Sequence, residues 1–401
     1  MIKRTLQELC LNITDGKHGD CENEENSGYY FISCKDIFDG QINYKNARQI
    51  TKADFEETHK RTMLEVDDIL LTNSGTIGRM AFVTDREATT KTTFQKSVAI
   101  IKPDKQKVLP RYLYYQLQNC VPQFINSSNG SAQKNLLLST MRTFQIEIEE
   151  NREKQEKIAN TLSAYDDLIE NNRKQIKLLE EAAQRLYKEW FVDLHFPGHE
   201  NTKIVDGLPE GWSKSTVFEV SAILRRGISP KYNENARGIV INQKCIRQTI
   251  VSYDEARAQE KKYPAELELK EADIAICSTG AGTLGRVGQI YEVRENTTLD
   301  SHVTLIRANE KIGQQYLFWS LKMQQDYLMS AGKGSTNQLE LSRETIGNCK
   351  ILMPEQKIAE QAEKNFVAIH NKMKECSMQI ARLREARDLL LPKLMSGEVE
   401  M

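Results

Sequence analysis

The hydrophobic and polar positions of the chain follow two patterns, and each pattern occurs twice. In residues 1–150 and again in 205–352, short apolar runs such as VAIIK (98–102) and VTLIR (303–307) stand between turns rich in Gly, Ser, Asn and Thr. These runs predict β-strands, and YLYYQL (112–117) and YLFWSL (316–321) predict short helices among them. A long segment with helical periodicity follows each stretch, at 151–192 and at 353–401.

The two long segments have the apolar spacing of coiled-coil helices. Residues 153–191 lack Pro and Gly, their apolar positions recur at alternating spacings of four and three, and the second segment repeats this up to Pro392. Because such a helix cannot bury its apolar stripe alone, and because about 200 residues separate the segments, we expect them to pair antiparallel. The expected helix-pairing seam consists of Ile158, Leu162, Ile169, Asn172, Ile176, Leu179, Leu186, Phe366, Ile369, Met373, Ile380, Leu383 and Leu390.

Asn172 is the polar member of this seam. A polar residue at such a position usually fixes helix register and partner at some cost in stability. The alternative is a side chain that points to solvent at a slightly unwound turn.

The chain also repeats itself at the level of individual residues. Asp68-Ile69 matches Asp273-Ile274, TIGR (76–79) matches TLGR (283–286), Tyr112-Leu113 matches Tyr316-Leu317, and KIA (157–159) matches KIA (357–359). Further blocks at 97–98 and 130–131 match 302–303 and 334–335 in the same order, with offsets between 200 and 207 residues. The chain is therefore a tandem duplication of a unit of about 200 residues.

We accordingly expect an α+β protein with two tandem globular α/β domains, separated by long helices that pair as an antiparallel coiled coil, with a pseudo-two-fold internal repeat. The expected domains are 1–150, a helical spacer at 151–192, 205–352, and a distal helical spacer at 353–401.

Composition narrows the class of protein. The 401 residues, of which 28% are charged and 39% hydrophobic, exclude a mainly disordered or collagen-like chain. The eight cysteines show no CxxC spacing, and no apolar run approaches the length that crosses a membrane. We therefore expect a cytoplasmic chain with reduced cysteines, no metal site and no membrane contact.

Charge is distributed unevenly in a nearly neutral chain. Residues 86–142 hold nine Lys and Arg against only Glu87 and Asp104, and residues 225–262 hold nine Lys and Arg against four acidic residues. Two local basic regions suit two separate contacts with a polyanion, although solvated surface is an equally good explanation of the charge alone.

Gly280-Ala281-Gly282-Thr283-Leu284-Gly285 satisfies the dinucleotide-binding pattern GxGxxG. A dinucleotide site would need a helix after it, whereas the following RVGQIYEV reads as a strand, so a turn between strands is the better interpretation. No phosphate-binding loop, aminomethyltransferase motif or metal-ligand histidine spacing is present, and His18 reads as a turn residue rather than a general base. The sequence therefore predicts a chain that is not an enzyme and holds no cofactor.

Polar and basic residues near the predicted turns suit contacts with DNA phosphates and base edges instead. For any single residue, a solvated loop is at least as good an explanation. The candidates for DNA binding are Lys17, Thr76, Arg79, Lys91, Gln95, Lys96, Ser131, Gln133, Lys134, Arg225, Arg226, Lys231, Gln243, Lys244, Arg247, Thr283, Arg286, Ser335, Thr336, Asn337 and Gln338.

Taken together, these blocks make the whole chain closely resemble the DNA-specificity subunit of type I restriction–modification systems. Residues 157–191 are similar to the central spacer of that family, GLPEGW (207–212) to the opening of its second target-recognition domain, and 354–366 with 389–399 to its distal spacer. One departure is a second spacer about four residues longer between its KIA and QI blocks, which is about one helical turn.

The resemblance implies a mechanism that the residues alone do not. Each target-recognition domain would read one half of a split sequence in double-stranded DNA, and the paired spacers would set the gap and dock two methyltransferase subunits. Those partners would bind S-adenosylmethionine and methylate a flipped-out adenine, and restriction/translocase subunits would join for cleavage. The alternatives are a coiled-coil scaffold whose duplicated domains bind proteins, and an oxidoreductase or methyltransferase built on the Gly-rich loop.

Overall fold

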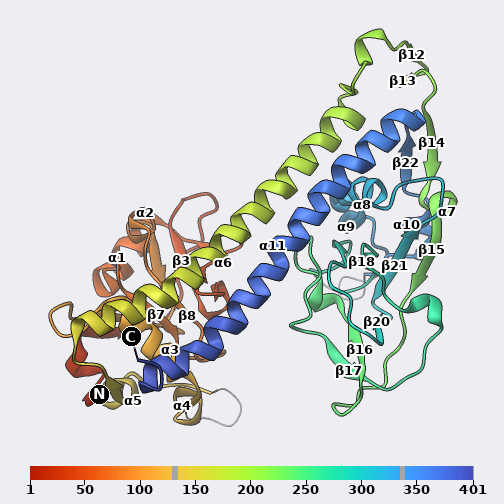
Figure 1. Ribbon diagram of the computed structural model, residues 1–401. Helices are drawn as coiled ribbons and strands as arrows, with labels where there is room; N and C mark the ends of the chain where they lie inside the picture. The colour runs from red at the N-terminus through yellow and green to blue at the C-terminus, as the bar shows by residue number, and fades with distance from the viewer. Residues whose placement is uncertain (129–133, 281, 335–338, 401) are drawn as a thin grey trace. The chain divides into compact units, whose positions relative to one another are not determined.

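The chain folds into two compact units in a computed structural model that describes residues 1–128, 134–280, 282–334 and 339–400 (Figure 1). Unit 1 comprises Met1–Ile169 and Arg382–Met401, and unit 2 comprises Glu170–Ala381. Each unit combines a sheet-bearing segment with parts of both long helices, so the α+β class is confirmed. The expected boundaries near 150, 192, 205 and 352 stay predictions, because the division into units falls within the helices.

Unit 1 contains three main sheets. A four-stranded antiparallel sheet has the order β2-β10-β7-β8, a three-stranded sheet has the order β6-β3-β9, and β1 pairs with β11. The strands are β1 (Ile2–Thr5), β2 (Cys10–Asp15), β3 (Tyr30–Ile32), β4 (Ile37–Phe38), β5 (Gln41–Ile42), β6 (Arg48–Gln49), β7 (Ile69–Thr72), β8 (Met80–Phe82), β9 (Thr92–Phe94), β10 (Val98–Pro103) and β11 (Gln145–Ile148). The helices are η1 (Gln7–Leu9), η2 (Cys34–Asp36), α1 (Lys52–Thr62), α2 (Arg86–Thr89), α3 (Pro110–Asn119), α4 (Val121–Asn126) and α5 (Leu138–Thr143).

Unit 2 repeats these three sheets in the same order and orientation. Its sheets are β15-β21-β18-β19, β17-β16-β20 and β14-β22. The strands are β12 (Ile204–Val205), β13 (Leu208–Pro209), β14 (Ser213–Thr216), β15 (Ser221–Arg226), β16 (Gly238–Ile241), β17 (Arg257–Gln259), β18 (Ile274–Cys277), β19 (Val287–Gln289), β20 (Thr297–Leu299), β21 (Val303–Ala308) and β22 (Lys350–Met353). The helices are α7 (Val217–Val220), η5 (Gln243–Cys245), η6 (Ala265–Leu267), α8 (Gln314–Met323), α9 (Gln325–Ser330) and α10 (Arg343–Gly347).

The predicted strands and short helices lie where the sequence places them. VAIIK lies in β10, VTLIR in β21, YLYYQL in α3 and YLFWSL in α8. The GxGxxG segment joins β18 to β19, which pair antiparallel, so the turn between strands is confirmed and no βαβ unit follows the glycines. The units differ at one element, because unit 2 has the three-residue η6 where unit 1 has the eleven-residue α1.

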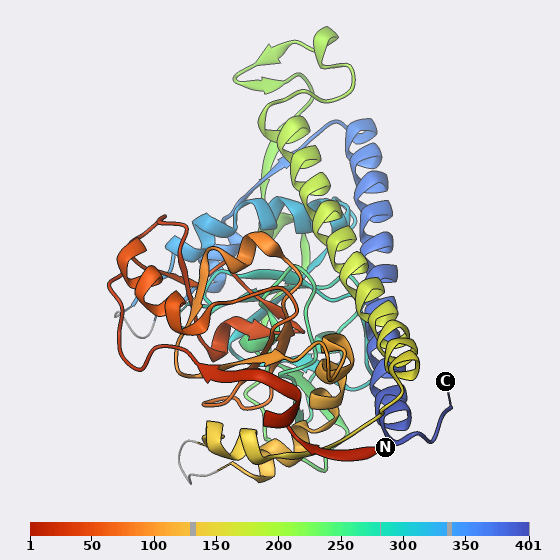
Figure 2. The same cartoon turned by 90° about the vertical axis from the view of Figure 1, so that its left-hand side faces the viewer.

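Two long helices connect and complete the units. Helix α6 (Arg152–Tyr187) continues into the π-helical turn η3 (Lys188–Val192), and the short η4 (His199–Asn201) follows after six residues without helix. Helix α11 (Gln356–Ser396) is continuous through Pro392. Figure 2 shows both helices from the side. Among the described helices, none is long and apolar enough to span a membrane.

Within each unit the two helices lie against each other in opposite directions. In unit 1, Ile158 and Leu162 share a core with Leu394 and Met395. In unit 2, the later part of α6 packs on the early part of α11, and Ala183 shares a core with Phe366. The expected seam residues are all buried or half-buried, and Asn172 is only 5% exposed, which excludes the solvent-directed alternative for its side chain.

Candidate functional site

The polar loops of unit 1 meet where three strands end. The backbone N–H of Lys17 donates to Phe94 O at 2.8 Å after β2 and β9, Asn73 N donates to Ser97 O at 3.1 Å, and Leu136 N donates to Asn73 O at 2.8 Å. Gly16 permits this approach, because a Cβ there would lie 1.9 Å from Phe94 O. These bonds fix one surface, here called loop cluster 1, from residues 15–18, 72–79, 95–97 and 134–139.

Loop cluster 1 surrounds a cavity of about 590 Å³. The cavity is lined by Asp15, His18, Arg61, Asn73, Ser74, Lys96, Asn135, Leu136, Leu137, Leu138 and Ser139. Arg61 comes from the last turn of α1, and the other lining residues come from the loops and the start of α5. The cavity therefore joins a helix found only in unit 1 to loops that both units share.

A buried carboxylate binds two polar side chains of this cavity. The Asp15 side chain is 7% exposed, and it accepts hydrogen bonds from Arg61 Nη2 at 2.5 Å and His18 Nε2 at 2.9 Å. The Arg61 and His18 side chains are themselves 49% and 59% exposed. Asp15 thus orients two half-exposed donors at the cavity wall.

The structure brings only some of the predicted unit 1 residues into this cluster. Thr76, Arg79, Gln95, Lys96 and Lys134 lie in its loops, and Arg79, Lys96 and Lys134 are exposed with no ion pair among the described residues. Lys17 also lies in the cluster, but its ammonium contacts Asp54 at 3.0 Å and Glu57 at 3.3 Å. The hydrogen bond with Asp54 raises the pKa of Lys17, and the carboxylates of Asp54 and Glu57 offset the charge that its ammonium keeps.

Lys91 lies apart from the other predicted residues of unit 1. It stands before β9, at the end of the strand opposite to Gln95, and its ammonium pairs with Glu87 at 2.7 Å. A strand of three residues advances about 10 Å, so Lys91 does not belong to loop cluster 1.

Unit 2 forms an equivalent surface, here called loop cluster 2, from residues 226–229, 277–280, 282–286, 300–302 and 339–341. Ile228 N donates to Leu299 O at 2.9 Å, Ser278 N to His302 O at 2.8 Å, and Leu341 N to Ser278 O at 2.8 Å. These bonds repeat the backbone connections of loop cluster 1.

The side chains of loop cluster 2 differ from those of loop cluster 1. Arg226 pairs with Glu340 at 2.7 Å and donates to Leu341 O at 3.0 Å, and Thr279 Oγ1 lies 2.6 Å from His302 Nδ1. Burial raises the pKa of Asp300, which accepts the backbone N–H of His302 at 2.8 Å.

The other predicted residues of unit 2 divide between this cluster and the surrounding surface. Thr283 and Arg286 lie in the cluster, and Gln243 approaches its Gly280, where a Cβ would lie 2.9 Å from Gln243 Nε2. Outside the cluster, Arg225 pairs with Glu266, Lys231 with Glu260 and Arg247 with Glu255, and Lys244 is exposed. Ser131, Gln133, Ser335, Thr336, Asn337 and Gln338 lie outside the described residues.

Sequence reasoning missed Asp15, Arg61 and Asn73 of unit 1 and His302 of unit 2. No turn pattern in the sequence marks Arg61 as a candidate, because it lies in the last turn of helix α1, 46 residues after Asp15. The spacing of Asp15 and His18 within one loop was visible in the sequence, but nothing in it shows which residues come to lie opposite them.

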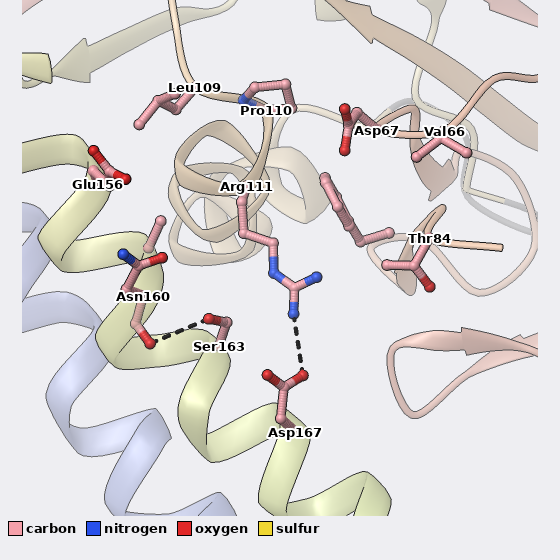
Figure 3. A pocket seen from close by; sticks show the side chains of 12 residues that line it. Val66, Asp67, Thr84, Leu109, Pro110, Arg111, Glu156, Asn160, Ser163 and Asp167 are labelled. Atoms are coloured by element: carbon pink, nitrogen blue, oxygen red, sulfur yellow. Dashed lines mark hydrogen bonds and ion pairs between the residues drawn. The ribbon is translucent and has the colours of Figure 1, made fainter. Parts of the chain in front are cut away.

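A second cavity of unit 1, also about 590 Å³, lies between the start of α3 and α6 (Figure 3). Arg111 crosses it, 3.6 Å from Asp167 and 5.0 Å from the ring centre of Phe82. None of the predicted DNA-binding residues lines this cavity, so it is not the candidate site. In the described part of the chain, no group of three or more His, Cys, Asp or Glu side chains is placed to hold a metal ion.

The chain is thus a duplicated α+β unit with one polar loop cluster in each copy. Residues 3–181 match the type I restriction modification DNA specificity domain. The type I restriction enzyme MjaIX specificity subunit of Methanocaldococcus jannaschii is 27% identical to the chain, and the match covers 92% of this chain and 87% of the relative. The HindI specificity subunit of Haemophilus influenzae is 24% identical, with 75% and 80% covered.

The fold agrees with these matches. The crystal structure of the S subunit of a type I restriction–modification system from M. genitalium superposes with a TM-score of 0.55 at 18% identity, over 98% of this chain and 95% of that chain. Over most of its length, the chain is thus similar to the specificity subunits of type I restriction–modification systems, and its first half matches their DNA specificity domain.

Proposed function

We propose that this chain recognises a bipartite sequence in double-stranded DNA as the specificity subunit of a type I complex, with one half-site read by each unit. The observation that carries this proposal is the duplicated loop cluster, in which the same strand ends present different side chains in unit 1 and unit 2. Equivalent scaffolds with different polar side chains suit two different half-sites, because phosphate contacts position a protein on DNA while base-edge contacts specify the sequence.

The long helices have a separate role in this proposal. Their antiparallel segments form a coiled coil that sets the distance between the two recognition surfaces and docks two methyltransferase subunits. In support, the seam residues are buried or half-buried along both helices. Adenine methylation then belongs to the partner subunits, which bind S-adenosylmethionine, and cleavage belongs to restriction/translocase subunits. The chain itself is non-catalytic and works in the cytoplasm.

Mapping of adenine methylation in the source genome, with and without the gene for this chain, tests the function. We expect loss of methylation at one bipartite motif on deletion and its return when the gene is restored. An unchanged methylome, in cells where the partner methyltransferase is expressed, would contradict the proposal. A coiled-coil scaffold that binds proteins would give that unchanged result, so the same measurement separates the two functions.

A further inference from the structure

Asn73 is a buried polar residue with an unused acceptor. It is 4% exposed and lines the cavity of loop cluster 1, and its Oδ1 has no hydrogen-bond partner among the described residues. The backbone holds it from both sides, because its N–H donates to Ser97 O and its carbonyl accepts from Leu136 N. Buried polar atoms are nearly always paired, so this oxygen points to a donor group that a ligand brings into the cavity.

Arg61 supplies the complementary chemistry on the same cavity. Its guanidinium donates one of its five N–H groups to Asp15 Oδ1, and the side chain is half-exposed at the cavity. Lys96 lines the same cavity, and its ammonium has no ion pair among the described residues. A fork of guanidinium donors fits a pair of acceptors, whereas Asn73 Oδ1 fits an amino group.

Unit 2 lacks this arrangement at the equivalent place. The residue before its matched glycine, Gly227, is Arg226 rather than an aspartate, and Asn73 is replaced by Ser278, whose hydroxyl lies 2.5 Å from Thr304 Oγ1. In place of α1, unit 2 has only the three-residue η6, which contains no arginine. The acceptor and the guanidinium are therefore features of unit 1 rather than requirements of the shared fold.

We infer that Arg61 and Asn73 are specificity-determining residues of unit 1 that together read one G·C base pair in its half-site, and that Asp15 positions Arg61. This inference rests on the proposed function. Guanine offers the acceptors O6 and N7 to the guanidinium, and its partner cytosine offers the N4 amino group to Asn73 Oδ1. In the major groove only a G·C pair presents two acceptors on one base and an amino donor on the other.

Competition binding and methylome mapping of the assembled complex test the inference, with wild type, Arg61→Gln, Arg61→Lys, Asn73→Ser and Lys60→Gln. We expect Arg61→Gln to relax one G·C position in one half-site, with discrimination at that position reduced about tenfold or more and the other half-site unchanged. Arg61→Lys keeps the charge without the fork and should relax the same position, as should Asn73→Ser, which introduces the residue of unit 2. Lys60→Gln removes the same charge from the neighbouring exposed residue of α1 and should leave the motif intact.

Asp15 is tested by the same readout. Asp15→Asn should relax the base position that Arg61→Gln relaxes, and Asp15→Glu should restore part of the discrimination. A merely structural role of Asp15 would lower binding to all sequences alike.

The inference is overturned if the Arg61 variants keep the wild-type motif or if the relaxed position is an A·T pair. It is also overturned if these variants weaken binding to all DNA sequences equally, as the loss of a phosphate contact does. These outcomes all require a wild-type complex that methylates one bipartite motif. Failure of the proposed function gives a different result, because then the wild-type chain itself directs no motif.

Discussion

The buried carboxylates of Asp68 and Asp273 stand at equivalent positions just before β7 and β18. Asp68 pairs with Lys102 at 2.7 Å, and Asp273 accepts Arg307 Nε and Nη2 at 2.7 and 2.6 Å. Each carboxylate also accepts a backbone N–H from three residues earlier, at 2.8 and 2.7 Å. Burial nevertheless raises the pKa of Asp68 to about 6. The Asp-Ile block repeats in the sequence because each copy of the sheet uses this ion pair where a strand begins.

The buried His370 predicts that the stability of unit 2 depends on pH. His370 is 4% exposed, stacks on Tyr291 at 4.2 Å between ring centres, and its Nδ1 lies 3.0 Å from Gln289 Oε1. Its Nε2 is buried without a hydrogen bond among the described residues and faces Glu271 at 3.6 Å, with Lys374 also close to that carboxylate. Burial lowers the pKa of His370 below its usual value of about 6.5.

The lowered pKa of His370 determines how the free energy of unfolding changes with pH. Above pH 6.5 the imidazole is neutral in both folded and unfolded chains, whereas below it the unfolded chain binds a proton that the folded chain resists. We expect the free energy of unfolding to fall as the pH drops below about 6.5, and His370→Gln to make that dependence shallower. Denaturant unfolding of the chain between pH 5 and 8 measures this. The exposed His195→Gln is the control and should keep the wild-type slope, and an equal slope for His370→Gln would contradict the assignment.

At the scale of elements, the two units attach equivalent helices to the long helices by different means. The N–H groups in the first turn of α8 donate to the Glu363 carboxylate on α11 at 3.1 and 2.8 Å. Gly313 makes room for it, because a Cβ there would lie 2.1 Å from Glu363 Oε2. Unit 1 has Leu109 and Ser163 at the corresponding positions, and both line the cavity in Figure 3. At these two positions, unit 2 therefore has a glycine and a carboxylate that interact, where unit 1 has a leucine and a serine.

This pairing predicts a coupled double substitution. Gly313→Ala should push the carboxylate away from α8, and Glu363→Ser should remove it, so each should destabilise the fold by about 1–2 kcal/mol, the usual loss when a helix N-terminus loses its cap. The double variant should lose less than the sum, because the two changes remove one interaction. Unfolding midpoints in denaturant provide the measurement. Glu360→Ser, on the exposed side of α11, should change stability by less than about 0.5 kcal/mol, and strict additivity of the pair would contradict the coupling.

At the scale of the whole molecule, the local charge count overstated the free positive charge. Of the basic residues in 86–142, Lys91, Lys102, Lys105 and Lys107 each pair with a carboxylate. Lys102 and Lys105 find their partners 34 and 38 residues earlier in the chain. A count along the sequence cannot include such partners. Among the described residues of this region, Arg86, Lys96 and Lys134 are exposed without an ion pair and remain for a polyanion.

The duplication also predicts that the two units act independently on DNA. Arg79 and Arg286 are equivalent residues of the repeated TIGR and TLGR segments, and both are exposed or half-exposed in their loop clusters. We expect Arg79→Gln to weaken or relax one half-site, Arg286→Gln the other, and the double variant to combine the two effects, because the effects of independent sites add. Methylome mapping or competition binding of the complex provides the readout. The exposed Lys311→Gln serves as control, and changes in both half-sites from one substitution would contradict independence.

The sequence by itself determined the duplication, the strands and helices, and the apolar stripe of both long helices. Each of these depends on the order and spacing of neighbouring residues, which local periodicity and repeated blocks express directly. The β18–β19 turn at the Gly-rich loop follows from the same local information.

Only the tertiary structure decided which polar residues face one another. Asp15, Arg61 and Asn73 come from a strand end, a helix end and a second strand end, and they line one cavity. Backbone hydrogen bonds through residues 94–97 join the two strand ends, and the Arg61–Asp15 hydrogen bond joins the helix end to them. Tertiary contacts also neutralised Lys17 and placed Lys91 away from loop cluster 1. The physical reason is that the charge available to a ligand depends on neighbours brought in from distant parts of the chain, whereas local propensity and periodicity depend only on nearby residues.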